Sequence, residues 1–327
     1  MNPVTLLEGG RLASFDPDLG VTVMAPESDG DGYWVGCPGV VYEPARARFL
    51  LTYRQRRPRG ADRERGWRIA IAESDDGVRF RDVWAVEKEE LGTCSLERSC
   101  LLAAPDGGYR LYISYVDPAD NRWRIDVLRA ETPDAFSVAG AEPVLTAAST
   151  GTEGVKDPYA LYVGPAVYLF ASYAEPAQLT DGDRAKAHAS GDIYNTGVTV
   201  HPTGLATSLD GRGFDWRGQV LGVGEHWDRY QARLNSVIRM DNAFLGFYDG
   251  SGSAAENYEE RTGLALSFDL VSWQRLTVRE PWIVSPYASG SIRYVDVVEI
   301  DGEWWLYYEM TREDGAHELR LSRVCVQ

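Results

Sequence analysis

Two stretches of this chain are nearly the same: Trp67-Arg-Ile-Ala-Ile-Ala72 and Trp123-Arg-Ile-Asp-Val-Leu128. Alternation of apolar residues with period two is typical of a β-strand that has one buried face. Similar segments recur at residues 204–208, 262–267 and 318–324. The recurrence of one type of strand along the chain indicates a repeat architecture.

Each of these strands follows two others in a fixed order. An aromatic strand comes directly before it, at residues 48–53, 109–115, 167–173, 244–248 and 304–308. A more apolar strand comes before that, at residues 35–42, 96–103, 155–163, 233–239 and 293–300. Five copies in one order, at roughly 60-residue spacing, are not explained by a pair of β-sandwiches.

A fourth strand is expected after a tight turn. Ser74-Asp-Asp-Gly-Val-Arg-Phe80 and Ser208-Leu-Asp-Gly-Arg-Gly-Phe214 share one pattern, and residues 267–273 keep its spacing without the glycine. Asp-Gly is a hairpin turn because both residues tolerate positive φ. The sequence therefore predicts an all-β chain, in which residues 1–327 form a single five-bladed β-propeller of four-stranded antiparallel sheets.

Composition excludes several classes of partner. The 327-residue chain carries a formal net charge of -16, which disfavours nucleic acid and anionic membrane surfaces. It has no run of about 18 apolar residues, and its first ten residues lack the features of a secretory signal. We therefore expect a cytoplasmic protein.

Neither a metal nor another cofactor is expected. Cys37, Cys94, Cys100 and Cys325 lack the spacing of metal ligands, and we expect reduced thiols. A disulfide bond between Cys94 and Cys100 is the alternative if the chain is exported.

The lengths of the connections indicate where a ligand binds. Connections between the first and second strands are short, whereas those between the second and third are long. The long loops are residues 54–66, 116–122, 174–203, 249–261 and 310–317. In a propeller they share the rim where the first strands begin, which predicts a ligand funnel there. Loop 174–203 is expected to cover it and to carry Tyr194 and Asn195 toward the ligand.

The starts of the first strands carry charges that are expected to face the axis. Burying a charge costs several kcal/mol of folding free energy unless the charge is paired or serves a function. Two interpretations therefore stay open: a ring of structural ion pairs and a functional site. The candidate catalytic carboxylates are Glu97, Asp157 and Asp296. The candidate ligand-binding residues are Trp34, Arg98, Lys156, Tyr194, Asn195, Arg233, Asn235 and Arg293. Strand alternation places Lys156 and Asp157 on opposite faces.

Lys156-Asp157-Pro158 carries a family resemblance. A carboxylate before a proline at the start of a first strand resembles the five-bladed glycoside hydrolase superfamily of arabinanases, β-xylosidases and invertases. The resemblance implies a small carbohydrate or glycoside as partner. Glu97 stands at the second of the family's carboxylate positions, but Cys37 stands at the first, where the family carries Asp.

The departure at Cys37 leaves three functions open. Glycoside hydrolysis needs two carboxyl groups, which Glu97 and Asp157 could supply, with Asp296 or a loop carboxylate as substitute. The cations Arg98, Lys156, Arg233 and Arg293 could instead hold phosphate, as in the related mannoside phosphorylases, or an anionic sugar. A propeller that binds carbohydrate without catalysis is the third possibility.

Overall fold

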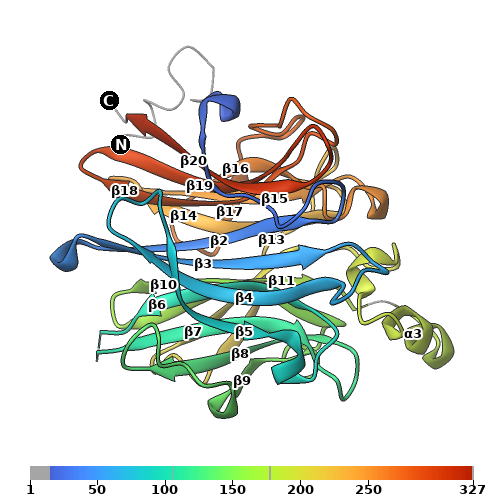
Figure 1. Cartoon of the computed structure of the whole chain (residues 1–327). Helices are drawn as coiled ribbons and strands as arrows, with labels where there is room; N and C mark the ends of the chain where they lie inside the picture. The colour runs from blue at the N-terminus through green and yellow to red at the C-terminus, as the bar shows by residue number, and fades with distance from the viewer. Residues whose placement is uncertain (1–14, 106, 177, 326–327) are drawn as a thin grey trace.

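Antiparallel β-sheet dominates the computed structural model, which describes residues 15–105, 107–176 and 178–325 (Figure 1). The strands pair as successive four-stranded antiparallel units. The predicted all-β class and four-stranded sheets are confirmed.

The first three units follow one another along the chain. Unit one is β2 (Trp34–Glu43), β3 (Arg48–Arg57), β4 (Arg65–Ser74) and β5 (Arg81–Glu87). Unit two is β6 (Leu96–Ala103), β7 (Tyr109–Val116), β8 (Trp123–Ala130) and β9 (Glu142–Leu145). Unit three is β10 (Gly154–Val163), β11 (Ala166–Ala174), β12 (Thr203–Ser208) and β13 (Asp215–Leu221).

The last two units complete the sheets. Unit four is β14 (Gln231–Arg239), β15 (Phe244–Ser251), β16 (Arg261–Ser267) and β17 (Trp273–Arg275). Unit five is β18 (Ile292–Ile300), β19 (Glu303–Thr311), β20 (His317–Cys325) and the early strand β1 (Val21–Met24). Strand β1 pairs antiparallel with β20, with Val21 opposite Leu321, so the two ends of the described chain close one sheet.

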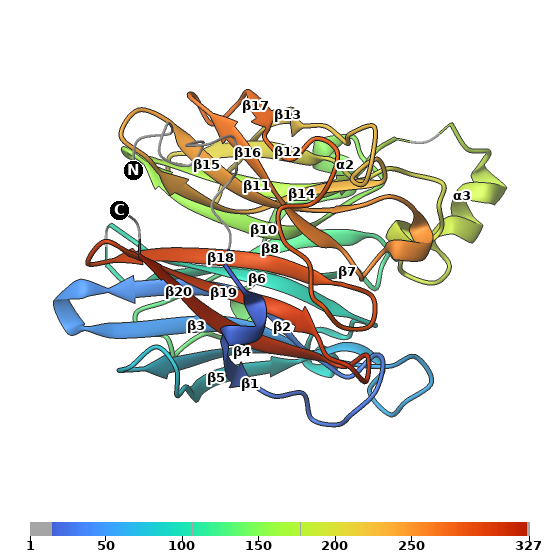
Figure 2. The same ribbon diagram turned by 90° about the horizontal axis from the view of Figure 1, so that it is seen from above.

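Short helices occupy the connections. The helices are α2 (Ala147–Thr150), α3 (Asp181–His188) and 3-10 turns at Pro17–Leu19, Pro44–Arg46, Lys88–Leu91, Val138–Gly140, Ile193–Asn195 and Ala254–Glu256. Helix α3 lies within the long loop 174–203. Figures 1 and 2 place it at the end of the molecule opposite the turn between β2 and β3. None of the helices in the described ranges is long and apolar enough to cross a membrane.

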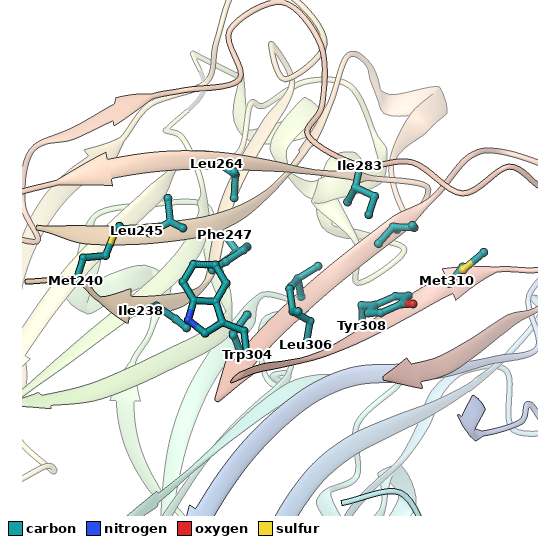
Figure 3. Packing of buried hydrophobic residues seen from close by; sticks show 13 residues of the cluster. Ile238, Met240, Leu245, Phe247, Leu264, Ile283, Trp304, Leu306, Tyr308 and Met310 are labelled. Carbon is teal, nitrogen blue, oxygen red and sulfur yellow. The ribbon is translucent and has the colours of Figure 1, made fainter. Parts of the chain in front are cut away.

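The first strands of the units lie against one another. Strand β6 packs against β2 and β10, β14 packs against β10 and β18, and β18 packs against β2. The row of first strands therefore closes on itself. Apolar side chains fill the space between the units, as Phe247 and Trp304 do between units four and five (Figure 3).

Every first strand has a bulge near its start. The pairing register shifts between Gly36 and Gly39 in β2, and likewise in the other first strands, at residues 96–99, 156–159, 234–236 and 293–296. Residues Cys37, Asp157 and Tyr294 have φ of 54°, 58° and 54° there. A bulge disrupts strict alternation and re-aims side chains. The predicted separation of Lys156 and Asp157 is wrong for this reason: Lys156 Nζ lies 3.8 Å from Asp157 Oδ2.

The four cysteines are free thiols. Cys37 and Cys100 are buried, whereas Cys94 and Cys325 are exposed. No disulfide bond joins Cys94 to Cys100.

Candidate functional site

Charged side chains near the bulges form one buried cluster, which we call the central cluster. Its members are Arg54, Glu97, Lys156, Asp157, Arg233, Asp249, Glu260, Arg293 and Glu309. Five of the predicted site residues belong to it: Glu97, Lys156, Asp157, Arg233 and Arg293. None of their side chains is more than 2% exposed. Charges buried this deeply are stable only with partners of opposite sign.

Arg233, from β14, joins two units through its guanidinium. Its Nη1 donates to Asp157 Oδ2 at 2.8 Å, and its Nη2 donates to Asp249 Oδ2 at 2.6 Å. Glu260 Oε1 lies 3.8 Å from Nη1. The backbone N–H of Tyr294 also donates to both Asp249 oxygens, at 3.1 and 2.9 Å.

Arg293 and Arg54 extend these contacts around the centre. Arg293 donates to Glu260 Oε2 at 2.7 Å and to Glu309 Oε1 at 2.9 and 2.6 Å. Arg54 donates to Glu97 Oε2, and its other terminal nitrogen lies 3.8 Å from Glu309 Oε2. Ion pairs therefore run without a break from Glu97 to Asp157.

Nearby cations lower the pKa of Glu260 and Glu97, whereas burial raises the pKa of Asp249 despite its contact with Arg233. Burial raises the pKa of Glu260, but Arg233 and Arg293 outweigh it and lower that pKa to about 2. Burial likewise raises the pKa of Glu97, and the charges of Arg54, Lys156 and other cations bring it below its ordinary value. Ionised carboxylates suit a base or the stabilisation of positive charge.

Lys156 sits in an aromatic enclosure. Its ammonium lies 4.4 Å from the centre of the Tyr194 ring, 5.0 Å from Trp123 and 5.7 Å from Tyr258. Cation–π contacts of this kind hold an ammonium in place without neutralising it.

Glu309 occupies the space beside Cys37. The backbone N–H of Cys37 donates to Glu309 Oε2 at 3.1 Å, and its Sγ lies 3.9 Å from the same oxygen. A Cβ on Gly36 would come within 2.0 Å of that oxygen, so a glycine there makes room for the carboxylate. Burial raises the pKa of the Cys37 thiol, which is neutral. A carboxylate from β19 thus lies where the family resemblance leads one to expect a carboxylate from β2.

Arg98, Asn235 and Asp296 form a second group. Arg98 donates to the carbonyl of Asn235 at 2.7 Å and to that of Pro38 at 3.0 Å, and its Nη2 lies 3.9 Å from Asp296 Oδ1. Asp296 accepts from the Val40 N–H at 2.6 Å, and burial raises its pKa to about 6. The backbone N–H of Arg98 links this group to Asp157, at 3.4 Å.

The aromatic candidates are packed against protein groups. Trp34 stacks on His317 with ring centres 4.4 Å apart, and the Arg56 guanidinium lies 4.5 Å from its ring centre. Tyr194 is fully buried and donates its hydroxyl to the Ser172 carbonyl at 3.0 Å. Asn195 is exposed. Trp34 and Tyr194 are only 5% and 0% exposed, so neither ring has a face that is open to solvent.

Three long loops meet at Asp192, which is fully buried. Arg59 of loop 54–66 donates to Asp192 Oδ2 at 2.9 Å, and Tyr258 of loop 249–261 donates its hydroxyl to the same oxygen. Asp192 itself lies in loop 174–203. The loops are therefore tied together at one carboxylate.

Sequence reasoning missed Arg54, Asp249, Glu260 and Glu309. A signal for three of them was present, because Arg54, Asp249 and Glu309 each directly follow a tyrosine near the end of a second strand. Within the described ranges, no group of three or more His, Cys, Asp and Glu side chains is arranged to hold a metal ion.

Comparisons with known proteins identify the fold through structure and not through sequence. No family model matches the chain, and no curated protein matches it in sequence. Among solved structures, a "Glycoside hydrolase" superposes with a TM-score of 0.70 at 14% identity, covering 94% of this chain and 92% of the other. The chain has the fold of a glycoside hydrolase.

Two further structures agree. A thermostable family-43 glycoside hydrolase has a TM-score of 0.64 at 12% identity, covering 94% of this chain and 93% of its own. A β-1,2-mannobiose phosphorylase from Listeria innocua, in complex with β-1,2-mannobiose, has a TM-score of 0.61 at 15% identity and covers 94% of each chain. The predicted resemblance is confirmed at the level of fold.

Proposed function

We propose that the five units are the blades of one five-bladed β-propeller, and that its central cluster hydrolyses a glycoside. The closed row of first strands supports the propeller. Structures with this fold include glycoside hydrolases and a mannobiose phosphorylase, which supports a carbohydrate as substrate.

The observation that carries the proposal is the pair of carboxylates at matching bulges. Glu97 and Asp157 occupy the same position in the bulges of β6 and β10. The ammonium of Lys156 lies 3.8 Å from Asp157, and its charge lowers the pKa of Glu97. Both Asp157 oxygens accept hydrogen bonds, from the Arg98 backbone N–H and from Arg233. Glu97 uses Oε2 for Arg54, and its Oε1 accepts no hydrogen bond from the residues that the structure describes.

These differences divide the roles. Glu97 has a free oxygen and a lowered pKa, so it is the base that takes a proton from the attacking water. Asp157, held by Arg233, is an electrostatic anchor for the oxocarbenium-like transition state.

Charge favours hydrolysis over phosphorolysis. Within the central cluster, the carboxylates Glu97, Asp157, Asp249, Glu260 and Glu309 are all in ion-pair contact with Arg54, Arg233 or Arg293. Inorganic phosphate would have to compete with these carboxylates for Arg54, Arg233 and Arg293, which they already hold. Arg56, beside the cluster, has no such partner among the described residues, and the assay with phosphate tests it. The phosphorylase alternative therefore has less support than the hydrolase.

The test is a panel of 4-nitrophenyl glycosides, assayed with and without inorganic phosphate. This leaving group needs little help from an acid, so the assay isolates the base. We expect turnover without phosphate, and a loss of about 100-fold or more in Glu97→Gln. Glu89→Gln, at an exposed carboxylate of Lys88–Leu91, is the matched control. Turnover that requires phosphate, or full turnover in folded Glu97→Gln, would contradict the proposal.

A further inference from the structure

Arg56 differs from the arginines of the central cluster. Its side chain is buried, at 6% exposure, yet no carboxylate lies within 4.0 Å of it among the residues that the structure describes. Its Nε is buried without a hydrogen-bond partner. An unpaired buried cation is costly, so a guanidinium held in this state calls for a partner that arrives from outside.

Two aromatic rings hold Arg56 in place. Its guanidinium carbon lies 4.5 Å from the centre of the Trp34 ring and 4.2 Å from that of Tyr258. Trp34 is fixed in turn by its stacking on His317. Rings contact the face of a guanidinium and leave the N–H groups at its edge for an acceptor. A side chain ordered in advance also loses less entropy when it binds.

A second incompletely neutralised cation is close by. Lys156 lies 5.7 Å from the centre of the same Tyr258 ring, and its nearest carboxylate oxygen is at 3.8 Å. The charges of both Lys156 and Arg56 act on Glu97 and help to lower its pKa. The two cations therefore lie beside the proposed base.

We infer that Arg56, assisted by Lys156, binds a carboxylate group on the substrate, which makes the substrate a uronoside. The inference rests on the proposed function, because it places this carboxylate next to the reacting group Glu97. A planar carboxylate fits the fork of a guanidinium with two parallel hydrogen bonds. A monoanion also meets less repulsion than a phosphate dianion from Glu97 and Asp157. Arg233 and Arg293 cannot take this role, since carboxylates of the protein already occupy them.

Calorimetric titration tests the inference directly. The probes are the methyl glycosides of glucuronic and galacturonic acid in both anomers, each compared with its neutral glucoside or galactoside. We expect one uronoside to bind about 10-fold or more tightly than its neutral counterpart, as a charge-assisted hydrogen bond implies. Arg56→Gln should abolish this preference and Arg56→Lys should keep part of it. Arg63→Gln removes another arginine of the same loop, which pairs with Glu87, and should leave the preference unchanged.

Several outcomes would overturn the inference. They are a panel in which no uronoside is preferred, a preference that survives in folded Arg56→Gln, and Arg56-dependent binding of inorganic phosphate in place of uronosides. Different results would contradict the proposed hydrolase function and the uronoside inference. A uronoside that binds through Arg56 but is not hydrolysed contradicts the hydrolase, whereas hydrolysis of neutral glycosides alone contradicts only the uronoside.

Discussion

At the scale of single residues, Asp296 shows how burial changes a carboxyl group when it outweighs a neighbouring cation, Arg98. Burial raises its pKa from 3.8 to about 6. The folded state then binds this proton more tightly than the unfolded state does, so stability is lost as pH rises from about 4 through about 6. We predict that Asp296→Asn lacks this loss. The change in unfolding free energy between about pH 4 and pH 8 should then differ from wild type by about 1–3 kcal/mol.

Urea denaturation of both proteins across this range measures the effect. The neighbouring Arg98 favours the ionised form and limits its size. Parallel pH profiles for wild type and Asp296→Asn would show that Asp296 does not titrate as described.

Cys37 stands where the resemblance to glycoside hydrolases leads one to expect Asp, and substitution there tests whether a carboxylate fits. An Asp there would be buried beside Glu309, whose oxygen already lies 3.1 Å from the Cys37 nitrogen. Two like charges in one buried place repel each other, so we predict that Cys37→Asp lowers the unfolding free energy by about 3 kcal/mol or more. Cys37→Ser is the control of similar size. A Cys37→Asp protein that is as stable as wild type and more active would reverse this view of the site.

At the scale of elements, the closure of unit five depends on β1. Val21 and Thr22 pair with Leu321 and Arg320, and Thr22 also donates to Glu318 at 3.2 Å. Without β1 the edge of β20 is free to pair with other chains.

We predict that a chain truncated to begin at Ala25 loses at least about 5 °C in Tm and tends to associate. Thermal denaturation and size-exclusion chromatography measure both. Thr22→Val, which keeps the strand but removes the contact with Glu318, should behave nearly as wild type. A truncated protein that stays monomeric with an unchanged Tm would mean that β1 contributes little.

At the scale of the whole molecule, the loops of three units are tied at Asp192. Removing its charge weakens the bonds from Arg59 and Tyr258 together. We predict that trypsin cleaves Asp192→Asn several-fold faster within α3, which carries Arg184 and Lys186, while the Tm changes little because the sheets are intact.

Asp181→Asn, at an exposed carboxylate at the start of α3, is the matched control for this experiment. Equal cleavage rates for wild type and Asp192→Asn would show that Asp192 does not hold the loops together.

The sequence by itself determined the strands, because period-two alternation and turn residues are local signals. It also located the charges at the starts of the first strands, including Glu97, Asp157 and Arg233. Their neighbours were harder to predict: Asp249 and Glu309 come from second strands, and a strand pattern shows that a residue is buried but not which distant group it meets.

Only the tertiary structure decided the chemistry of the centre. A bulge at a non-glycine residue such as Asp157, with φ of 58°, leaves no mark in the sequence, yet it brings Lys156 to the same side. The pairing of β1 with β20 joins segments from opposite ends of the chain. The free guanidinium of Arg56 is likewise a property of the fold, since whether a buried charge has a partner depends on residues that are far apart in sequence and close in space.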